Sequence, residues 1–340
     1  MTSLRQTPIL ICIFLGVLIA VGVYVLADQL QSEETSVGRP ATIWQQIFKR
    51  PVIVPVHDKS PLSRAKIELG KRLFFDKRLS GAGDRNCATC HDPATGFTDG
   101  RVRALGLDGQ PLLRNTPTLW NLGWAKSFYW DGRISTLEDQ ARVPIEHPNE
   151  MGGRVESAAA ILSRDNAAMT LLKAAFPPVS QFTPELILES IAVYERSLVS
   201  PITRFDRWIA GEHTALSKQE FRGFQLFTGR GGCLSCHGGW RFTDDKFHDI
   251  GLDTADLGRG ALGDGGPAPP RFKTPGLREL VHTAPYMHDG SIATLEDVVA
   301  HYAGGLVRRP SLASNVVEDL RLVAAERSAL VAFLRSLSSE

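Results

Sequence analysis

The chain has 340 residues, which is enough for two domains of ordinary size. Its composition is that of a globular protein, with 43% hydrophobic and 22% charged residues. Lys and Arg (38) nearly balance Asp and Glu (37), whereas a nucleic-acid-binding protein would normally carry a basic excess. We therefore expect a globular protein with no nucleic-acid partner.

An uncharged apolar run covers residues 9–27, with Arg5 before it and Asp28 after it. Nineteen such residues can span a bilayer core, and the basic side favours a cytoplasmic N-terminus. Val25-Leu26-Ala27 would also suit signal-peptide cleavage, which stays the alternative to a retained anchor. In both cases the rest of the chain is predicted to be exported, and an uncleaved helix would hold it at the inner membrane.

The remaining chain divides by composition and motifs. Residues 1–30 are interpreted as the membrane anchor or signal segment, and the polar sequence that follows makes 31–60 a predicted linker. Two haem-binding domains are predicted at 61–205 and 206–340. The predicted fold is mainly α, with two cytochrome c-like domains related by an internal repeat and preceded by an N-terminal transmembrane helix.

The pattern Cys-x-x-Cys-His occurs twice, and it carries most of the functional argument. Two thiols at this spacing can reach the two vinyl groups of one porphyrin, and the next imidazole can bind its iron. A zinc site would need further Cys or His ligands close by, and a redox dithiol does not need the His. The remaining cysteine, Cys12, lies in the apolar run. We predict two covalently attached haem c groups, one on Cys87, Cys90 and His91, and one on Cys233, Cys236 and His237.

The two halves repeat each other in sequence. Residues 130–139 read WDGRISTLED and 288–297 read HDGSIATLED, at an offset of 158 (288 minus 130). The pair GKRLF and GFQLF precedes the two haem motifs, at 70–74 and 223–227, and Phe-Thr-Asp follows each motif. The halves are therefore predicted to be copies of one haem-binding unit.

The local patterns predict helices. Thr136 and Thr294 are expected N-caps of helices that begin Leu-Glu-Asp, because both acidic residues then lie in the first turn. Ser217 and Glu220 form a predicted capping box, and Thr183 before Pro184 is a further helix start. No long alternating pattern predicts a strand. An apolar stripe on the last predicted helix contains Leu330, Phe333, Leu334 and Leu337.

The sequence resembles the bacterial di-haem cytochrome c peroxidase family, which includes MauG. The resemblance runs from about Gly70 to the C-terminus and includes both haem motifs. It implies that peroxide reacts at the N-terminal haem and that the C-terminal haem transfers electrons. The further motifs that carry the resemblance are RNTP at 114–117, YWDGR at 129–133, NEM at 149–151 and TAPYMHDG at 283–290.

The resemblance also implies roles for residues between the two haem motifs. Trp130 corresponds to a tryptophan that lies between the haems and relays electrons. Gln140, Pro144 and Glu150 match the distal pocket of the reactive haem. Glu150 is the expected proton-transfer group, because a carboxylate can accept a proton from one peroxide oxygen and return it to the other. Gln140 is expected to hold the peroxide by hydrogen bonds.

The sixth ligands of the two irons are expected to differ. Related enzymes close the resting N-terminal haem with a His, but no His lies between His91 and His147 here, which predicts an open first haem. At the second haem the family uses Met or Tyr, and the matching residue is Tyr302. The repeat offset pairs Tyr302 with Pro144 (302 minus 144 is also 158), and proline cannot bind iron. Met287 is the alternative ligand.

Two further features follow from the resemblance. The family holds a calcium ion between its domains, and Asn115 with the main-chain oxygens of Thr283 and Pro285 matches those ligands. MauG carries a surface Trp two residues before its second haem motif, through which charge passes to a protein partner. Gly231 stands at that position here, which weakens the case for protein oxidation.

Three functions remain open from the sequence. The first is reduction of hydrogen peroxide to water with electrons from a small c-type cytochrome or another periplasmic donor. The second is oxidation of residues of a partner protein, as in MauG. The third is a non-catalytic di-haem electron carrier, which an open first haem with Glu150 beside it disfavours. The first is the prediction taken forward.

Overall fold

The computed structural model describes residues 37, 40–55, 61–263 and 268–340. The predicted membrane segment, residues 9–27, lies outside the described residues. Within the described part of the chain, no helix combines the length and the apolar character needed to cross a bilayer.

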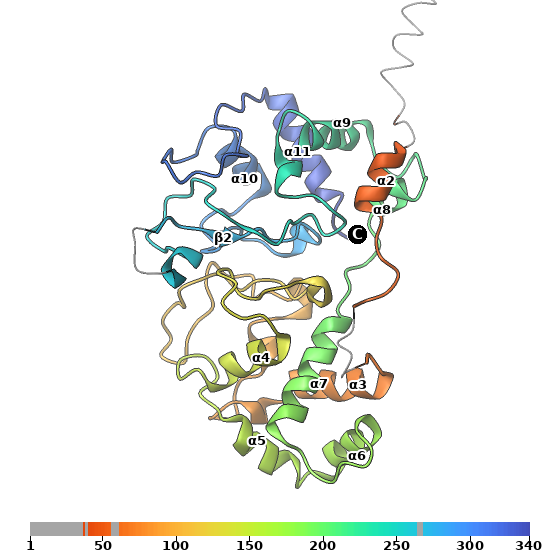
Figure 1. Ribbon diagram of the computed structural model, residues 1–340, viewed down its shortest axis with the longest axis vertical. Coiled ribbons are helices and arrows are strands. Elements are labelled where there is room, and N and C mark those ends of the chain that lie inside the picture. Colours follow the sequence, from red (N-terminus) through yellow and green to blue (C-terminus); the bar gives the residue numbers. More distant parts are fainter. Residues whose placement is uncertain (1–36, 38–39, 56–60, 264–267) are drawn as a thin grey trace, which may run out of the picture.

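The described chain is mainly helical and forms two halves stacked along the long axis of the molecule (Figure 1). The mainly α prediction is confirmed. The first half contains α3 (Arg64–Phe74), α4 (Leu137–Glu146), α5 (Val155–Leu162), α6 (Asn166–Ala175) and α7 (Pro184–Ser197). The second contains α8 (Arg204–Ile209), α9 (Lys218–Thr228), α10 (Leu295–Tyr302) and α11 (Ala324–Arg335).

Short elements connect these helices. Two strands, β1 (Phe247–His248) and β2 (Phe272–Lys273), pair antiparallel with Phe247 opposite Lys273. Short 3₁₀ turns include one at each predicted haem motif, over Cys87–Thr89 and Cys233–Ser235. The other 3₁₀ turns are Lys77–Leu79, Pro93–Thr95, Leu122–Trp124, Arg259–Leu262 and Leu280–His282.

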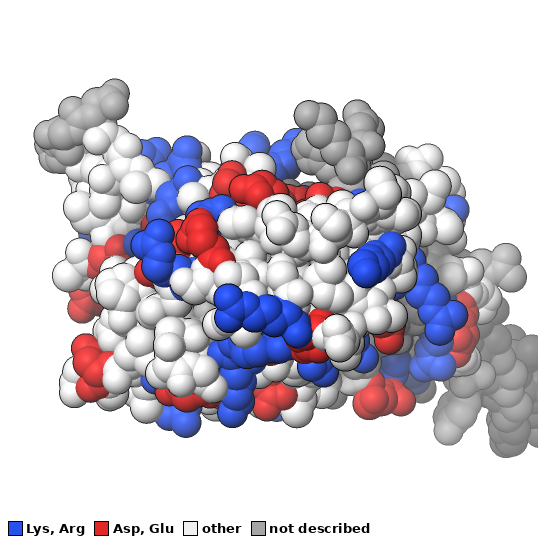
Figure 2. Space-filling view, turned by 90° about the horizontal axis from the view of Figure 1, so that it is seen from below, with Lys and Arg blue, Asp and Glu red and all other residues white. Residues whose placement is uncertain are grey.

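The surface carries charges of both signs. Seen from below in Figure 2, Lys and Arg side chains are interspersed with Asp and Glu over the end of the first half. Ion pairs on this half include Arg142 with Glu146, 3.0 Å apart one turn along α4. This distribution agrees with the near-zero net charge of the sequence.

The two halves repeat each other in three dimensions as well. In each half the helix that precedes the haem motif packs against the last long helix of that half, α3 against α7 and α9 against α11. Glycine is required at both crossings, because a Cβ at Gly70 or Gly223 would collide with the carbonyl oxygen of Ser190 or Ala329. The shared GxxLF sequence therefore sets how closely the helices approach.

The predicted helix starts are confirmed. Thr136 accepts a hydrogen bond from the Asp139 amide, and Thr294 accepts the equivalent bond from Asp297. Ser217 makes the predicted capping box at the start of α9, and Thr183 caps α7 ahead of its proline.

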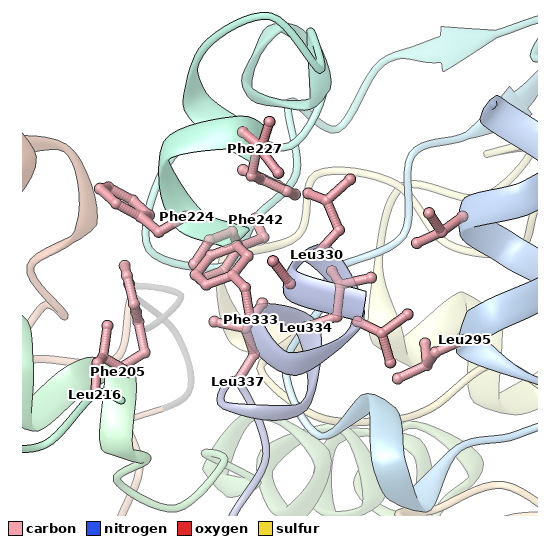
Figure 3. Packing of buried hydrophobic residues seen from close by; sticks show 14 of the residues in the cluster. Phe205, Leu216, Phe224, Phe227, Phe242, Leu295, Leu330, Phe333, Leu334 and Leu337 are labelled. Atoms are coloured by element: carbon pink, nitrogen blue, oxygen red, sulfur yellow. The ribbon is translucent and has the colours of Figure 1, made fainter. Parts of the chain in front are cut away.

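The largest hydrophobic core lies in the second half and is rich in phenylalanine (Figure 3). Phe205, Phe224 and Phe242 meet with ring centroids 5.3–5.7 Å apart, in tilted and edge-on arrangements. The predicted stripe on α11 is buried in this core. Leu330, Phe333 and Leu334 lie on α11 and Leu337 follows its end, and the Phe333 ring contacts Phe227 and Phe224 (Figure 3).

Part of the predicted linker is an ordered helix that belongs to the second half. Helix α2 (Thr42–Phe48) lies beside α8 in Figure 1, and Phe48 is fully buried in the phenylalanine core. Residues 42–48 therefore do not act as a free linker. Helix α8 also begins just before the predicted boundary at residue 206, because Phe205 packs into the second core.

Charged and backbone contacts join the halves. Arg114 of the first half lies 2.6 Å from Asp256 of the second and 2.6 Å from Asp131. The Asn115 amide donates to the carbonyl oxygen of His288. Lys273 donates from its backbone to Trp130 and from its side chain to the carbonyl oxygen of Ser127. These contacts bring the loops after both haem motifs together.

Candidate haem sites and the cavity between them

The first predicted haem loop presents an imidazole in a form suited to iron. His91 Nδ1 lies 3.0 Å from the carbonyl oxygen of Phe97, so this nitrogen carries the hydrogen and Nε2 is left with a free lone pair. Burial lowers the pKa of His91, which favours the neutral, metal-binding form. Phe97 itself has φ 60°, and this turn brings its carbonyl oxygen back toward the imidazole.

The second predicted haem loop has the same arrangement. His237 Nδ1 lies 2.8 Å from the carbonyl oxygen of Phe242, and burial lowers the pKa of His237. Phe242 has φ 58°, close to the value at Phe97. Each loop also carries two cysteines whose thiols are not in disulfides, Cys87 and Cys90 in the first and Cys233 and Cys236 in the second. These donors fit haem c at both loops.

One cavity of about 740 Å³ connects the two loops. It is lined by His91 from the first half and His237 from the second, and Trp130 lies on its wall between the halves. Trp130 Nε1 donates to the carbonyl oxygen of Asn115, 2.9 Å away, and the Trp130 carbonyl accepts from the Lys273 amide at 2.8 Å. The indole is thus held by a bond within the first half, and the Trp130 backbone is held by a bond from the second half.

The predicted distal residues of the first half line this cavity together with His91. Pro144 lies within α4, Gln140 lies one turn before it, and Glu150 follows the helix. Burial raises the pKa of Glu150, while His147, 3.6 Å away, opposes that shift. A carboxyl group at such a position can accept a proton and return it.

The candidate ligands of the second half line the same cavity. Tyr302 is the last residue of α10, the helix that corresponds to α4, and burial strongly raises the pKa of its phenol. Cys233 and Cys236 also raise it by electrostatic repulsion, so the phenol lies near both cysteines of the second motif. Met287 lines the cavity as well, so both candidate ligands remain available to the second site.

The three predicted calcium ligands all belong to the lining of this cavity. Asn115, Thr283 and Pro285 all line it. The Asn115 amide nitrogen donates to the carbonyl oxygens of Arg101 and Val102, at 2.9 and 3.2 Å, which fixes the orientation of the side chain. The three residues offer the hard oxygen donors that calcium prefers.

Gly231, which stands where MauG carries a surface tryptophan, is buried. A Cβ at Gly231 would lie 2.6 Å from the carbonyl oxygen of Leu226, so no larger side chain fits without a backbone movement. A surface tryptophan at this position is therefore incompatible with the conformation of this loop.

Several cavity residues were not identified from the sequence. Tyr129 directly precedes Trp130, and its hydroxyl lies 3.5 Å from Gln140 Nε2. Lys273 reaches the cavity from β2, and burial lowers its pKa to about 8. Glu195 does not line the cavity; it is buried on α7 within the first half, and burial raises its pKa to about 8. The repeat could have drawn attention to Tyr129, because it matches Met287 at the offset of 158; no local pattern marks Lys273 or Glu195.

Two repeated helical units, each with a Cys-x-x-Cys-His loop opening into a shared cavity, define a di-haem c-type cytochrome. The sequence profile of the family described as di-haem cytochrome c peroxidase matches residues 64–214. The methylamine utilization protein MauG of Methylorubrum extorquens is 44% identical over 301 residues, covering 86% of this chain and 84% of that protein. This chain belongs to the di-haem cytochrome c peroxidase and MauG family.

Other relatives include both kinds of enzyme. The cytochrome c551 peroxidase of Nitrosomonas europaea is 34% identical over 297 residues, covering 85% of this chain and 84% of that protein. The crystal structure of a MauG-like protein associated with microbial copper homeostasis superimposes with a TM-score of 0.77 at 31% identity, covering 86% of this chain and 95% of that one. Membership of a di-haem family implies that both loops carry haem c.

Proposed function

We propose that this chain reduces hydrogen peroxide to water with electrons from a small c-type cytochrome or another periplasmic donor. The observation that carries the proposal is the difference between two equivalent positions of the repeat. On the first side of the cavity the position holds Pro144, which cannot bind iron, and on the second it holds Tyr302, which can. With haem bound, the first site would therefore be open to peroxide, and Tyr302 could close the second.

The residues around the open site have complementary tasks in this proposal. His91 would hold a haem, which would supply the iron that binds peroxide and the electrons for cleavage of the O–O bond. Glu150 takes a proton from the oxygen nearer the iron and returns it to the leaving oxygen. Gln140 orients the peroxide by hydrogen bonds. Two observations support the role of Glu150: it lines the cavity with Gln140 and Pro144, and burial raises its pKa, which favours the protonated form.

The second site supplies electrons to the first. In this proposal His237 and Tyr302 hold the second haem, with Met287 as the alternative ligand. Trp130 lies between the halves and is bonded to both, which supports its assignment as the electron relay. Two electrons and two protons convert one peroxide to two waters, and the donor replaces the electrons through the second haem.

Oxidation of a partner protein, as the name MauG of the relatives suggests, is the second candidate. The 44% identity to a MauG and the presence of Tyr302 favour it. The buried Gly231 argues against it, because this loop has no room for a surface tryptophan that would pass charge to a partner. A non-catalytic carrier would be expected to have both irons closed, which Pro144 disfavours.

Two further assignments belong to the proposal. A calcium ion between the halves would be held by the side-chain oxygen of Asn115 and the main-chain oxygens of Thr283 and Pro285. The catalytic body would lie in the periplasm, and residues 9–27 would anchor it to the inner membrane. Covalent haem attachment and an apolar N-terminal run in the sequence support that location.

Steady-state turnover by the haem-loaded protein tests the proposed reaction. Hydrogen peroxide consumption is measured with a reduced small c-type cytochrome, with ascorbate alone and with no donor. We expect rapid consumption only with the cytochrome, accompanied by its oxidation at two equivalents per peroxide. The proposal would be overturned if peroxide consumption did not depend on the cytochrome and instead produced oxidised residues on an added protein. That result would favour oxidation of a partner protein.

A further inference from the structure

A tyrosine that the proposed reaction does not use lines the first side of the cavity. Tyr129 directly precedes the relay residue Trp130 and lines the cavity with Gln140 and Glu150. Gln140 Nε2 donates a long hydrogen bond of 3.5 Å to its hydroxyl oxygen. The guanidinium of Arg133 lies 3.7 Å from the centre of the phenol ring and fixes its orientation from one face.

The backbone at Tyr129 is held in an unusual conformation. Its φ is 67°, in the left-handed region that large side chains rarely adopt, and the repeat-related residue Met287 has φ 74°. Glycine would be the ordinary choice at such a position, yet both copies hold a long side chain that lines the cavity. The repeat thus uses this turn to direct one side chain into the cavity from each half.

The Tyr129 hydroxyl has a proton available to donate. Burial raises the pKa of Tyr129 to about 12, so the phenol is neutral at physiological pH. Gln140 uses a lone pair of the hydroxyl oxygen, and no residue in the described part of the chain accepts the hydroxyl proton. A hydroxyl group both donates and accepts hydrogen bonds, so its donor function is available to a ligand in the cavity.

We propose that the Tyr129 hydroxyl donates a hydrogen bond to the oxygen ligand at the first haem site. The peroxide pocket then contains three polar side chains with separate tasks. Glu150 moves the proton, Gln140 positions the substrate, and Tyr129 is a neutral donor that stabilises negative charge on the bound oxygen. This inference rests on the proposed assignment of the open site to the first half.

Fluoride binding to the oxidised, haem-loaded protein tests the donor without relying on turnover. Fluoride binds ferric iron and can only accept hydrogen bonds, so its affinity reports donors in the pocket. Tyr129→Phe removes the hydroxyl and keeps the ring. We expect its dissociation constant for fluoride to rise about tenfold or more, as for loss of a hydrogen bond to an anion.

Two further variants make the result specific. Tyr129→Met introduces the residue that the other half carries at the same φ, and it should weaken fluoride binding as Tyr129→Phe does. Tyr194→Phe is the matched control, because Tyr194 lies in the same half on α7 and is not among the residues that line the cavity. It should leave the fluoride affinity unchanged.

The outcomes separate this inference from the proposed function. Equal fluoride affinity in wild type, Tyr129→Phe and Tyr129→Met would overturn the inference, as would a wild-type protein that binds no fluoride. A selective loss in both Tyr129 variants would support the donor even if peroxide turnover proved independent of the cytochrome. In that case only the proposed physiological reaction would fail.

Discussion

At the residue scale, Glu150 is the group on which peroxide cleavage is expected to depend most. Glu150→Gln keeps the size and hydrogen-bonding capacity of the side chain but removes the exchangeable proton. We expect both haems to load normally and the reaction with peroxide to slow by about 100-fold, which is typical for a lost proton-transfer group. Stopped-flow absorbance of the first haem after mixing with peroxide measures this rate.

A nearby carboxylate provides the control for Glu150. Glu146 lies at the end of α4, is exposed and pairs with Arg142 at 3.0 Å. Glu146→Gln should react with peroxide at the wild-type rate. Equal rates in Glu150→Gln and wild type would remove Glu150 from the proton-transfer role.

Tyr302 can be tested through the spin state of the second iron. A phenolate is a hard anionic ligand, so it should keep the second haem low-spin and lower its reduction potential relative to His–Met ligation. Tyr302→Phe should convert the low-spin electron paramagnetic resonance signal to a high-spin one and leave the first haem unaffected. If Met287→Leu abolishes that signal instead and Tyr302→Phe does not, Met287 is the ligand.

Glu195 should make the stability of the protein depend on pH. Its pKa is raised by burial to about 8, and no residue in the described part of the structure makes a hydrogen bond to its Oε2. The neighbouring Arg196 instead makes two bonds of 2.8 Å to Glu138. Since the folded state holds this proton more tightly than the unfolded state, Glu195 should stabilise the fold below its unfolded pKa.

The raised pKa of Glu195 should make the folded protein less stable as the pH rises. As pH rises toward 8 the unfolded chain loses the proton first, so stability falls by up to about 1.4 kcal/mol per pH unit. Glu195→Gln should flatten the decrease in melting temperature between pH 5 and pH 8, measured by circular dichroism on the haem-loaded protein. Glu185→Gln, an exposed change on the same helix, should leave the decrease intact, and an equally steep decrease in Glu195→Gln would contradict the assignment.

The haem motifs could be predicted from the sequence because their chemistry is local. Two cysteines and a histidine within five residues form one turn, and each His finds its carbonyl partner five or six residues later. Tyr129 and Lys273 could not be placed in the same way. Tyr129 contacts Gln140, and Lys273 contacts Ser127, which is 146 residues away in the chain.

At the scale of elements, four helix starts were predicted from their capping residues, and the uncapped α2 was not predicted. Thr136, Thr183, Ser217 and Thr294 all cap as expected. Helix α2 has only seven residues, and Ala41 at its start makes no side-chain cap. Its stability comes from packing of Phe48 against Phe205 and Phe242, which no local pattern can reveal.

The crossing of α9 and α11 gives a prediction about helix packing. Gly223→Ala places a methyl group against the Ala329 carbonyl, so the two helices must move apart. We expect a loss of about 1–3 kcal/mol of unfolding free energy, although alanine favours an isolated helix by about 1 kcal/mol. Urea unfolding followed by circular dichroism measures the loss.

An exposed position on the same helix isolates the packing effect. Gln225→Ala should change the unfolding free energy little, because Gln225 faces solvent. The absorbance of the second haem should shift in Gly223→Ala, while that of the first should not. Unchanged stability in Gly223→Ala would mean that the helices tolerate a wider separation than the described crossing allows.

At the scale of the whole molecule, Arg114 holds the two halves against each other. It contacts Asp256 across the interface and Asp131 within its own half, each at 2.6 Å. Arg114→Leu leaves the two carboxylates without this cation, and we expect a loss of about 3 kcal/mol. Calorimetry of the haem-loaded protein should then show two transitions where wild type shows one, because the halves would unfold independently.

A control variant tests whether the loss of any surface arginine would produce two unfolding transitions. Arg142→Leu removes a cation that pairs with Glu146 on the surface of the first half, and it should leave a single transition. One transition at the wild-type temperature in Arg114→Leu would show that the backbone contacts are sufficient to join the halves.

The docked position of α2 has a consequence for how the chain is made. Phe48 leaves the ribosome 157 residues before its partner Phe205 (205 minus 48), and Phe224 and Phe242 follow later still. Helix α2 therefore cannot be buried until residues from the last two fifths of the chain have been made. Contacts between such distant residues form slowly because a long loop must close first. The core of the second half is consequently completed by residues from the beginning of the chain. Removal of the chain up to residue 50, which includes α2, should expose that core and leave the first half folded.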